Sequence, residues 1–364
     1  MHTSQHLQGE PAMQGPVVRA ASRILGAGMN LPEQRILNSH FAAYLETSDE
    51  WIRDRTGIAE RRWAAPEVGA SELAAPACVQ AIANSGLTVA DIDGVVCATV
   101  TPDYTFPSTA CFIQKRLGLR PGIAFDVNAV CSGFLYALVT ADALIARGLV
   151  RNVLVVGVDI YSTIIDKHDR GTCVLFGDGA GAVVLSATAP QGSATNGSAG
   201  DPHFVSGSGQ TLRGLYSSLL GADGAYTDIL CVPNGSAARP TPESAAAGSH
   251  YLKMAGKEVF KLAVRSLGDI SLRLLAESGF KPEDVDHFVS HQANKRILLS
   301  MAKHLNIPEE RILMNVEKYG NTSAASVPIV LAEFAANGTI KPGDLLLLSA
   351  FGGGVTWGAC LVRW

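Results

Sequence analysis

The sequence predicts an α/β fold built from two similar halves. Apolar runs of strand length alternate with helix-like segments along almost the whole chain, as in largely parallel sheets covered by helices. The strand-like segment from Asp91 to Val96 recurs in kind from Asp284 to Val289. The glycine-rich segment from Phe176 to Leu185 is matched, in the same order, by Phe351 to Val362. We therefore expect a duplicated unit with its active site where the halves meet.

Composition excludes several classes of protein. At 364 residues the chain exceeds one ordinary core, and 47% apolar with 17% charged residues indicates a well-packed globular protein. The apolar runs are too short to span a membrane, and a net charge of −4 gives no nucleic-acid signal. Seven cysteines without CxxC spacing argue against a disulfide framework and a zinc site, and they fit a reducing cytoplasm.

Polar segments set the expected domain boundaries. Residues 1–16 have no apolar signal core, which predicts a flexible N-terminal extension and argues against secretion. Residues 187–210 are rich in Gly, Ser, Ala and Asn and predict a loop or insertion, which the polar stretch 235–249 resembles. The predicted halves are therefore 17–186 and 211–364.

Cys131 is the first candidate for an active-site residue. It follows a strand-like run, Ile123 to Val130, and precedes a helix-like stretch, Phe134 to Val139. A thiol at the start of a helix lies near unpaired N–H groups and the positive end of the helix dipole, which lowers its pKa and favours the nucleophilic thiolate. The alternative is a small buried apolar side chain, as most free cysteines are.

Three further segments carry candidate site residues. His291 follows the strand-like run Val285 to Ser290, at the end of a strand where open α/β sheets build their sites. Asn321 lies among small residues before a helix, and three glycines at 352–354 let the backbone approach a ligand and direct an N–H at an oxyanion. The alternatives are a structural histidine, an ordinary helix cap and a tight turn.

These segments, in this order, resemble the β-ketoacyl-acyl carrier protein synthase III family of the thiolase superfamily, from about Val17 to Trp364. The two departures, the long N-terminus and residues 187–210, lie outside the matched site blocks. The resemblance implies a thiolase-like fold, in which two βαβαβαββ halves form five αβαβα layers. The matched blocks are Thr47–Ile52, Arg55–Ile58, Asn128–Phe134, Asp169–Thr172, Phe176–Gly181, Met254–Gly256, His291–Asn294 and Ala350–Gly354.

The resemblance also implies the reaction, the first step of type II fatty acid synthesis. Cys131 would be acylated by an acyl-coenzyme A, expected to be acetyl-coenzyme A, with the N–H groups of Cys131 and Gly353 as the oxyanion hole. His291 and Asn321 would stabilise the enolate that forms when malonyl-acyl carrier protein loses carbon dioxide. Condensation then yields a 3-oxoacyl thioester. The family needs no metal or cofactor beyond the coenzyme A thioester substrate.

Binding residues follow from the same resemblance. Trp51, Arg55 and Arg170 match the coenzyme A contacts, with Thr47 and Asn294 as weaker matches. In isolation, Trp51 reads as a half-buried core aromatic. Phe106 matches a residue that enters the partner subunit's acyl pocket, which implies a homodimer and a short starter.

A basic stripe is visible without the family. Lys253, Lys257, Lys261 and Arg265 recur every four residues, close to one face of a predicted helix. A solvated face is the usual explanation for such a run. Because the family has an acidic carrier protein as partner, we instead expect docking through Lys257, Lys261, Arg265 and Arg296.

Other functions share parts of this pattern. A related condensing enzyme of secondary metabolism with a medium-chain, branched or aromatic starter stays open. Degradative thiolases carry a second cysteine in the C-terminal glycine segment, and residues 352–354 hold none. An acyltransferase to a hydroxyl or amine, or a non-catalytic partner subunit, would not require Cys131, His291 and Asn321 together.

Overall fold

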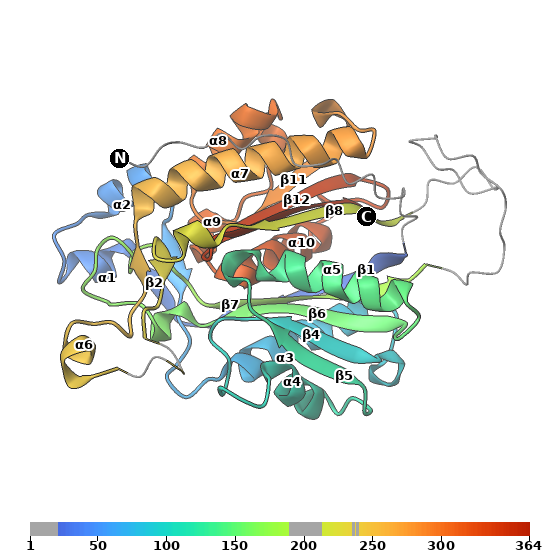
Figure 1. Cartoon of the computed structure of the whole chain (residues 1–364), viewed down its shortest axis with the longest axis horizontal. Helices are drawn as coiled ribbons and strands as arrows, with labels where there is room; N and C mark the ends of the chain where they lie inside the picture. Colours follow the sequence, from blue (N-terminus) through green and yellow to red (C-terminus); the bar gives the residue numbers. More distant parts are fainter. Residues whose placement is uncertain (1–20, 189–212, 235–236, 238–239) are drawn as a thin grey trace.

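Two mixed β-sheets form the framework of the computed structural model, which describes residues 21–188, 213–234, 237 and 240–364 (Figure 1). The first sheet has the strand order β1-β7-β6-β4-β5, and the second has the order β11-β12-β13-β8. The strands of the first sheet are β1 (Ser22–Asn30), β4 (Gly94–Ala98), β5 (Ile123–Val127), β6 (Asn152–Asp159) and β7 (Gly179–Ala187). Those of the second sheet are β8 (Gly214–Ala222), β11 (His287–Ser290), β12 (Leu345–Gly352) and β13 (Thr356–Arg363).

The two sheets repeat one pattern of strand directions. In the first, β6 pairs parallel with β4 and antiparallel with β7, which pairs antiparallel with β1. In the second, β12 pairs parallel with β11 and antiparallel with β13, which pairs antiparallel with β8. On its other side, β4 also pairs parallel with β5. At the corresponding place beside β11 there is only an isolated parallel bridge, from Phe288 to Ile312.

The expectation of largely parallel strands is therefore wrong, because each sheet has two antiparallel pairings. Two consecutive parallel strands must be joined by a long crossover connection, usually a helix, whereas consecutive antiparallel strands can be joined by a short turn. The link from β12 to β13 is a short turn at residues 353–355, and no α-helix lies between β6 and β7. The strand-like runs were correctly placed, but their directions depended on these connections.

Helices cover both sheets and fill the space between them, giving five layers (Figure 1). Helices α3 and α4 cover the outer face of the first sheet, α5 and α10 lie between the sheets, and α7 and α8 cover the second sheet. The helices are α1 (Asn38–Ala42), α2 (Asp49–Thr56), α3 (Ala70–Ser85), α4 (Thr109–Leu117), α5 (Gly133–Ala146), α6 (Pro242–Ala246), α7 (Gly256–Glu277), α8 (Lys295–Leu305), α9 (Val316–Tyr319) and α10 (Ser326–Ala336).

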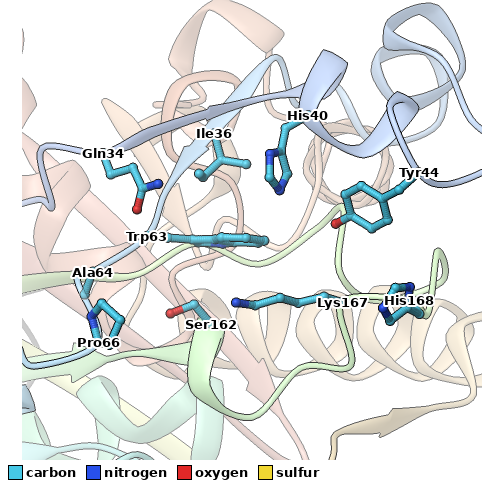
Figure 2. Close-up of a pocket in the computed structure, with 10 residues that line it drawn as sticks. All are labelled: Gln34, Ile36, His40, Tyr44, Trp63, Ala64, Pro66, Ser162, Lys167 and His168. Atoms are coloured by element: carbon cyan, nitrogen blue, oxygen red, sulfur yellow. The ribbon is translucent and has the colours of Figure 1, made fainter.

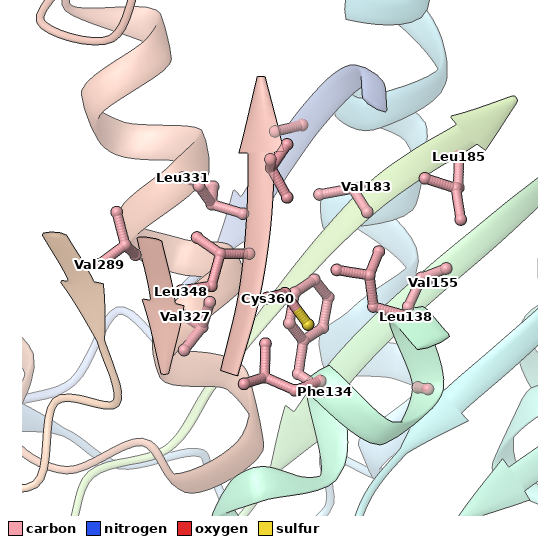
Figure 3. Packing of buried hydrophobic residues seen from close by; sticks show 14 of the residues in the cluster. Phe134, Leu138, Val155, Val183, Leu185, Val289, Val327, Leu331, Leu348 and Cys360 are labelled. Atoms are coloured by element: carbon pink, nitrogen blue, oxygen red, sulfur yellow. The ribbon is translucent and has the colours of Figure 1, made fainter. Parts of the chain in front are cut away.

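The central layer is apolar because its helices are covered on both sides. Phe134 and Leu138 of α5 and Val327 and Leu331 of α10 pack in one buried cluster with side chains of both sheets (Figure 3). A helix that is buried on all sides has no need of a polar face. This cluster joins the two halves and holds the starts of α5 and α10 close together, where the predicted site residues lie.

Two short ribbons complete the fold, β2 (Arg35–Leu37) with β3 (Glu60–Arg62) and β9 (Leu230–Cys231) with β10 (Lys253–Met254). The polar stretch expected as a loop at 235–249 contains helix α6. Thr241 and Ser244 cap this helix reciprocally and Pro242 begins it, so local capping signals outweighed the polar composition.

The predicted extension 1–16 lies outside the described residues, as does all but the beginning of the predicted insertion 187–210. The exact boundaries of the two halves therefore stay predictions. Among the helices of the described residues, none combines the length and apolar character needed to cross a membrane.

Candidate active site

Cys131 lies on the predicted turn between a strand and a helix. After β5 ends at Val127, a 3₁₀ turn from Val130 to Ser132 leads directly into α5. Val130 adopts a positive φ of 49°, an unusual conformation for a β-branched residue that is typical of strained functional turns. Cys131 is only 4% exposed, so its sulfur lies inside the protein.

The expectation of a lowered thiol pKa is not met in this structure. The pKa of Cys131 is raised to about 12, chiefly by burial and to a lesser extent by the nearby carboxylate of Asp159. Hydrogen bonds from the Ser323 and Tyr161 side chains act in the opposite direction but are outweighed. Position at a helix N-terminus lowers the pKa of a thiol, but here burial of the sulfur away from water raises that pKa by more.

Asn321 is fixed by the backbone around it. Its N–H donates to Leu175 O at 2.9 Å, and its carbonyl accepts from Gly177 N at 3.0 Å. Its side-chain Oδ1 accepts from the N–H of Ser323 at 2.9 Å. Because Oδ1 is engaged and the residue is buried, the Nδ2 group is the part of this side chain that can donate to a ligand.

His291 follows β11 directly, as predicted, and is buried. Its Nδ1 lies 2.7 Å from the Oγ of Ser326, and that oxygen also accepts from Gln292 N at 3.3 Å. When Ser326 donates its proton to Nδ1, Nε2 carries the imidazole proton and is the donor of the ring. Burial lowers the pKa of His291 to about 4, against a smaller opposing effect of the Ser323 backbone, so the ring is neutral near pH 7.

The glycine segment packs against the turn that carries Cys131. A Cβ at Gly352 would lie 2.7 Å from the Cys131 nitrogen and 3.0 Å from the oxygen of Ala129, so only glycine fits there. Thr356 Oγ1 lies 3.0 Å from Ala129 O and 3.1 Å from Gly353 O, which ties the two segments together. In the described chain, neither predicted oxyanion donor, the N–H of Cys131 or Gly353, donates to a backbone carbonyl.

One turn, Ser323 to Ser326, connects the three predicted catalytic residues. Ser323 contacts the Cys131 sulfur at 3.4 Å through its hydroxyl and Asn321 through its N–H, while Ser326 contacts His291. The structure thus brings together residues from both halves of the chain, as the duplicated pattern predicted.

The predicted coenzyme A residues form a cluster of their own. The guanidinium carbons of Arg55 and Arg170 lie 4.7 Å and 4.8 Å from the Trp51 ring centroid. Arg170 also donates to the carbonyl of Glu46. Ser48 caps α2 by accepting from Trp51 N at 3.0 Å, which holds the indole in place. This arrangement leaves two cationic groups stacked against one aromatic ring.

Thr47 and Asn294, the weaker matches, differ in how they are engaged. The Thr47 hydroxyl is buried and has no hydrogen-bond partner among the described residues. Asn294 caps α8, because its Oδ1 accepts from Ile297 N at 3.0 Å. The beginning of α8 touches the end of α2, since a Cβ at Gly57 would lie 2.5 Å from that of Lys295.

The basic stripe is shorter than predicted. Lys253 belongs to β10, whereas α7 begins at Gly256, so Lys253 does not continue the helical face. Lys257, Lys261 and Arg265 are exposed on α7. The Nε atom of Arg265 lies 3.8 Å from Oδ2 of Asp269. The spacing of four residues correctly predicted that Lys257, Lys261 and Arg265 share one face of a helix. Lys253 is separated from that helix by Ala255, whose backbone is not helical. Arg296 is exposed at the start of α8.

Phe106 is the most exposed large apolar side chain of the described residues, at 82%. Tyr104 is also exposed, and its ring packs edge-on against Phe112 at a centroid distance of 5.1 Å. A single exposed aromatic is common, but two in one loop form an apolar projection.

A surface pocket is lined by none of the predicted site residues (Figure 2). The Lys167 ammonium lies 5.2 Å from the centroid of the Trp63 ring in this pocket. Since Cys131 does not line it, the pocket is not the predicted centre of chemistry. Its lining residues are Gln34, Ile36, His40, Tyr44, Trp63, Ala64, Pro66, Ser162, Lys167 and His168.

Sequence reasoning missed three buried residues beside Cys131. Ser323, Tyr161 and Asp159 all influence the Cys131 thiol, as hydrogen-bond donors or as a charge. Ser323 belongs to the small-residue run around Asn321, which was a usable signal. Nothing local marks Asp159, the last residue of β6, or Tyr161, which follows that strand, because only the fold brings them to Cys131.

Comparisons with known proteins identify the family of this chain. Residues 125–200 match the family model for 3-oxoacyl-[acyl-carrier-protein] synthase III, and residues 275–364 match the model for its C-terminal part. A β-ketoacyl-[acyl-carrier-protein] synthase III of Paracoccus denitrificans is 47% identical over 94% of this chain and 98% of its own length. One of Rhodobacter capsulatus is 44% identical over 95% of this chain and 99% of its own.

Solved structures are similar over the same length. The 3-oxoacyl-[acyl-carrier-protein] synthase III of Aquifex aeolicus is 40% identical, with a TM-score of 0.81 over 94% of this chain and 100% of that one. The enzyme of Pseudomonas aeruginosa is also 40% identical, with a TM-score of 0.82 over 94% and 98%. These matches confirm the predicted thiolase-like fold and acyltransferase class, and this chain belongs to the β-ketoacyl-acyl carrier protein synthase III family.

Proposed function

We propose that this chain starts fatty acid synthesis by joining the acyl group of an acyl-coenzyme A to malonyl-acyl carrier protein. The observation that carries the proposal is the convergence of Cys131, Asn321 and His291 on the turn from Ser323 to Ser326. A thiol, an amide and a neutral imidazole suit a reaction that transfers an acyl group and builds negative charge on carbonyl oxygens.

The first step acylates Cys131. Its sulfur attacks the thioester carbonyl, the carbon–sulfur bond to coenzyme A breaks, and the proton lost by the cysteine equals the one gained by the leaving thiol. The N–H groups of Cys131 and Gly353 would hold the oxyanion, which agrees with their lack of a backbone acceptor in the described chain. Sulfur suits this role because the acyl-enzyme is still an activated thioester.

The second step condenses the two substrates. Loss of carbon dioxide from the malonyl group leaves its electron pair in an enolate, whose oxygen would accept from His291 Nε2 and Asn321 Nδ2. Donors of this kind are each worth about 3 kcal/mol in related oxyanion sites. The enolate carbon attacks the acyl-Cys131 carbonyl, the thiolate leaves, and a proton taken up from solvent restores the thiol.

Coenzyme A would bind at the cluster around Trp51. Guanidinium groups pair with phosphates, and an arginine plane can stack on a purine as it does on the indole here. The unpartnered Thr47 hydroxyl supplies a further polar group in the same segment. Asn294 would contribute through Nδ2 only, because its Oδ1 caps α8.

The acyl carrier protein would dock on α7 and α8. Lys257, Lys261 and Arg296 are exposed and form no ion pair with other described residues, so they can meet an acidic partner. Arg265 is less available because of Asp269. We further propose a cytoplasmic homodimer in which Phe106 of each chain enters the partner's acyl pocket, limiting the starter to short chains such as acetyl.

Mass spectrometry of the intact protein tests this function. The enzyme and Cys131→Ser are incubated with acetyl-, butyryl-, isobutyryl- and octanoyl-coenzyme A, and malonyl-acyl carrier protein is then added while carbon dioxide is measured. We expect an acetyl mass shift that the variant lacks, followed by carbon dioxide release. Cys131→Ser should lose at least about 100-fold in acylation rate, because a serine hydroxyl is a far weaker nucleophile than a thiolate.

Other outcomes point elsewhere. Acylation without carbon dioxide release would support an acyltransferase and contradict the condensing role of His291 and Asn321. A mass shift with only a longer or branched donor would keep the reaction but replace the acetyl starter. Equal acylation of the enzyme and Cys131→Ser would show that Cys131 is not the nucleophile.

A further inference from the structure

A buried tyrosine hydroxyl lies behind the predicted nucleophile and has no part in the reaction described above. Tyr161 begins the 3₁₀ turn that follows β6 and is only 1% exposed. Its hydroxyl oxygen lies 3.2 Å from Ser323 Oγ, which in turn lies 3.4 Å from the sulfur of Cys131. Two hydroxyl groups thus form a short chain that ends at the thiol.

Packing fixes the position of the Tyr161 hydroxyl. Its ring stacks on Phe176 with a centroid distance of 4.6 Å and an interplanar angle of 13°. Phe176 forms a bridge with Asn321 through the backbone, so the ring beneath Tyr161 is connected to the same turn as Ser323. Because both partners of the stack are buried, the hydroxyl cannot turn away to solvent.

The charges around Cys131 explain why such donors matter. His291, which follows β11, is neutral near pH 7, and Asp159, at the end of β6, is a buried carboxyl that disfavours a nearby thiolate. Burial raises the pKa of Asp159 itself to about 6. The remaining side-chain contacts that lower the pKa of Cys131 are the hydroxyls of Ser323 and Tyr161. A buried thiolate without a cation depends on hydrogen-bond donors.

We propose that Tyr161 is a positioning residue for Cys131, whose hydroxyl acts with that of Ser323 to orient the sulfur and stabilise the thiolate as it forms. Each hydroxyl has one proton, so a negative sulfur draws the Ser323 proton towards itself and leaves the Ser323 oxygen to accept from Tyr161. The inference rests on the proposed function in that Cys131 is the nucleophile.

The test is the pH dependence of alkylation at Cys131. Iodoacetamide reacts with the thiolate, and peptide mass spectrometry separates Cys131 from the six other cysteines. Tyr161→Phe keeps the stacked ring and removes only the hydroxyl. We expect its alkylation profile to move to higher pH and its rate at pH 8 to fall about 10-fold, as for a lost hydrogen bond to a charged group. Acylation by acetyl-coenzyme A should fall in parallel.

Two further variants make the result specific. Ser323→Ala should shift the profile in the same direction, and the double variant should shift it by less than the sum, because the hydroxyls act as one chain. Tyr136→Phe is the matched control, since the Tyr136 hydroxyl donates to Gly221 O at 2.8 Å rather than to the site. Melting temperatures identify any variant that fails to fold. If Tyr161→Phe fails, the alkylation profile of Ser323→Ala alone tests the proposal.

The proposal is overturned if Tyr161→Phe, or Ser323→Ala where only that variant folds, gives the profile of Tyr136→Phe. Alkylation does not require an acyl-coenzyme A, so the test holds even if the wild-type enzyme accepts none of the starters. A wild type that is alkylated at Cys131 but never acylated would count against the proposed function and leave the role of Tyr161 to be decided by the profiles.

Discussion

At the scale of single residues, burial dominates the chemistry of this site. It raises the pKa of Cys131 and lowers that of His291, in each case favouring the neutral form. A neutral imidazole is a hydrogen-bond donor rather than a cation, which suits a carbonyl oxygen that becomes negative only during the reaction. The fold thus sets the protonation state of both side chains, and for His291 this affects the stability of the protein.

The pH dependence of stability reports on His291. Its pKa is about 4 in the folded protein and near 6.5 when unfolded, so the unfolded chain binds the proton more readily and stability is lost as pH falls through this range. Relative to His291→Gln, the wild type should therefore lose roughly 3 kcal/mol between pH 7.5 and pH 4. Urea denaturation of both proteins measures this. Asp159 and Asp178 have raised pKa values, so they stabilise the folded protein as the pH falls. This contribution is the same in both proteins and cancels in the difference between their free energies of unfolding. A constant difference across the range would show that His291 titrates normally.

At the scale of elements, the ends of strands and helices carry the site. Cys131 lies between β5 and α5, His291 between β11 and α8, and Asn321 shortly before α10. Side chains at such ends are held by short turns and by close backbone contacts such as that of Gly352 with Cys131. Helix faces serve a different purpose, because α7 turns one apolar face to the second sheet and leaves its basic residues exposed.

The exposed bases of α7 and α8 predict a separable effect on the two half-reactions. Lys261→Glu with Arg296→Glu should raise the KM for malonyl-acyl carrier protein at least about 10-fold, because complementary charge is replaced by repulsion. Acylation by acetyl-coenzyme A should not change. Steady-state kinetics and single-turnover acylation measure the two steps.

The control reverses two charges elsewhere on the surface. Arg147→Glu with Lys341→Glu has the same net charge change at exposed positions that belong to neither α7 nor α8. A similar rise in KM for the control, or an equal loss in both half-reactions of the test variant, would contradict a docking surface on α7 and α8.

At the scale of the whole molecule, one chain leaves two features uncovered. Strand β5 is the last strand of the first sheet, so its outer edge has no partner strand among the described residues. Phe106, in the loop before α4, projects into solvent. Both features favour association with a second copy of the chain.

The homodimer is therefore testable by mass. Sedimentation equilibrium should give twice the 38.2 kDa of one chain. Phe106→Ala should raise the acylation rate with octanoyl-coenzyme A relative to acetyl-coenzyme A, because a smaller side chain deepens the partner's pocket. A mass of one chain would contradict the shared pocket, and an unchanged ratio in a stable dimer would remove Phe106 from it.

Much of this fold could be predicted because apolar periodicity is a local property. The strands around Val153 and Leu346, the helix after Cys131 and the strand before His291 all occur where the pattern indicated. Directions of strands were less accessible, since they depend on connections such as the short turn from β12 to β13. The wrong assignment of Lys253 to a helix arose because charge spacing does not show where a helix begins.

The sequence by itself determined the duplicated α/β plan, the family and the identity of the predicted catalytic residues, because spacing and residue type carry that information. Tertiary structure alone decided what surrounds them. Tyr161 and Asp159 meet Cys131 only because β6 ends beside the turn of Ser323, and their effect on the thiol depends on complete burial. Desolvation is a property of packed volume rather than of neighbouring letters, so it cannot be read along a chain.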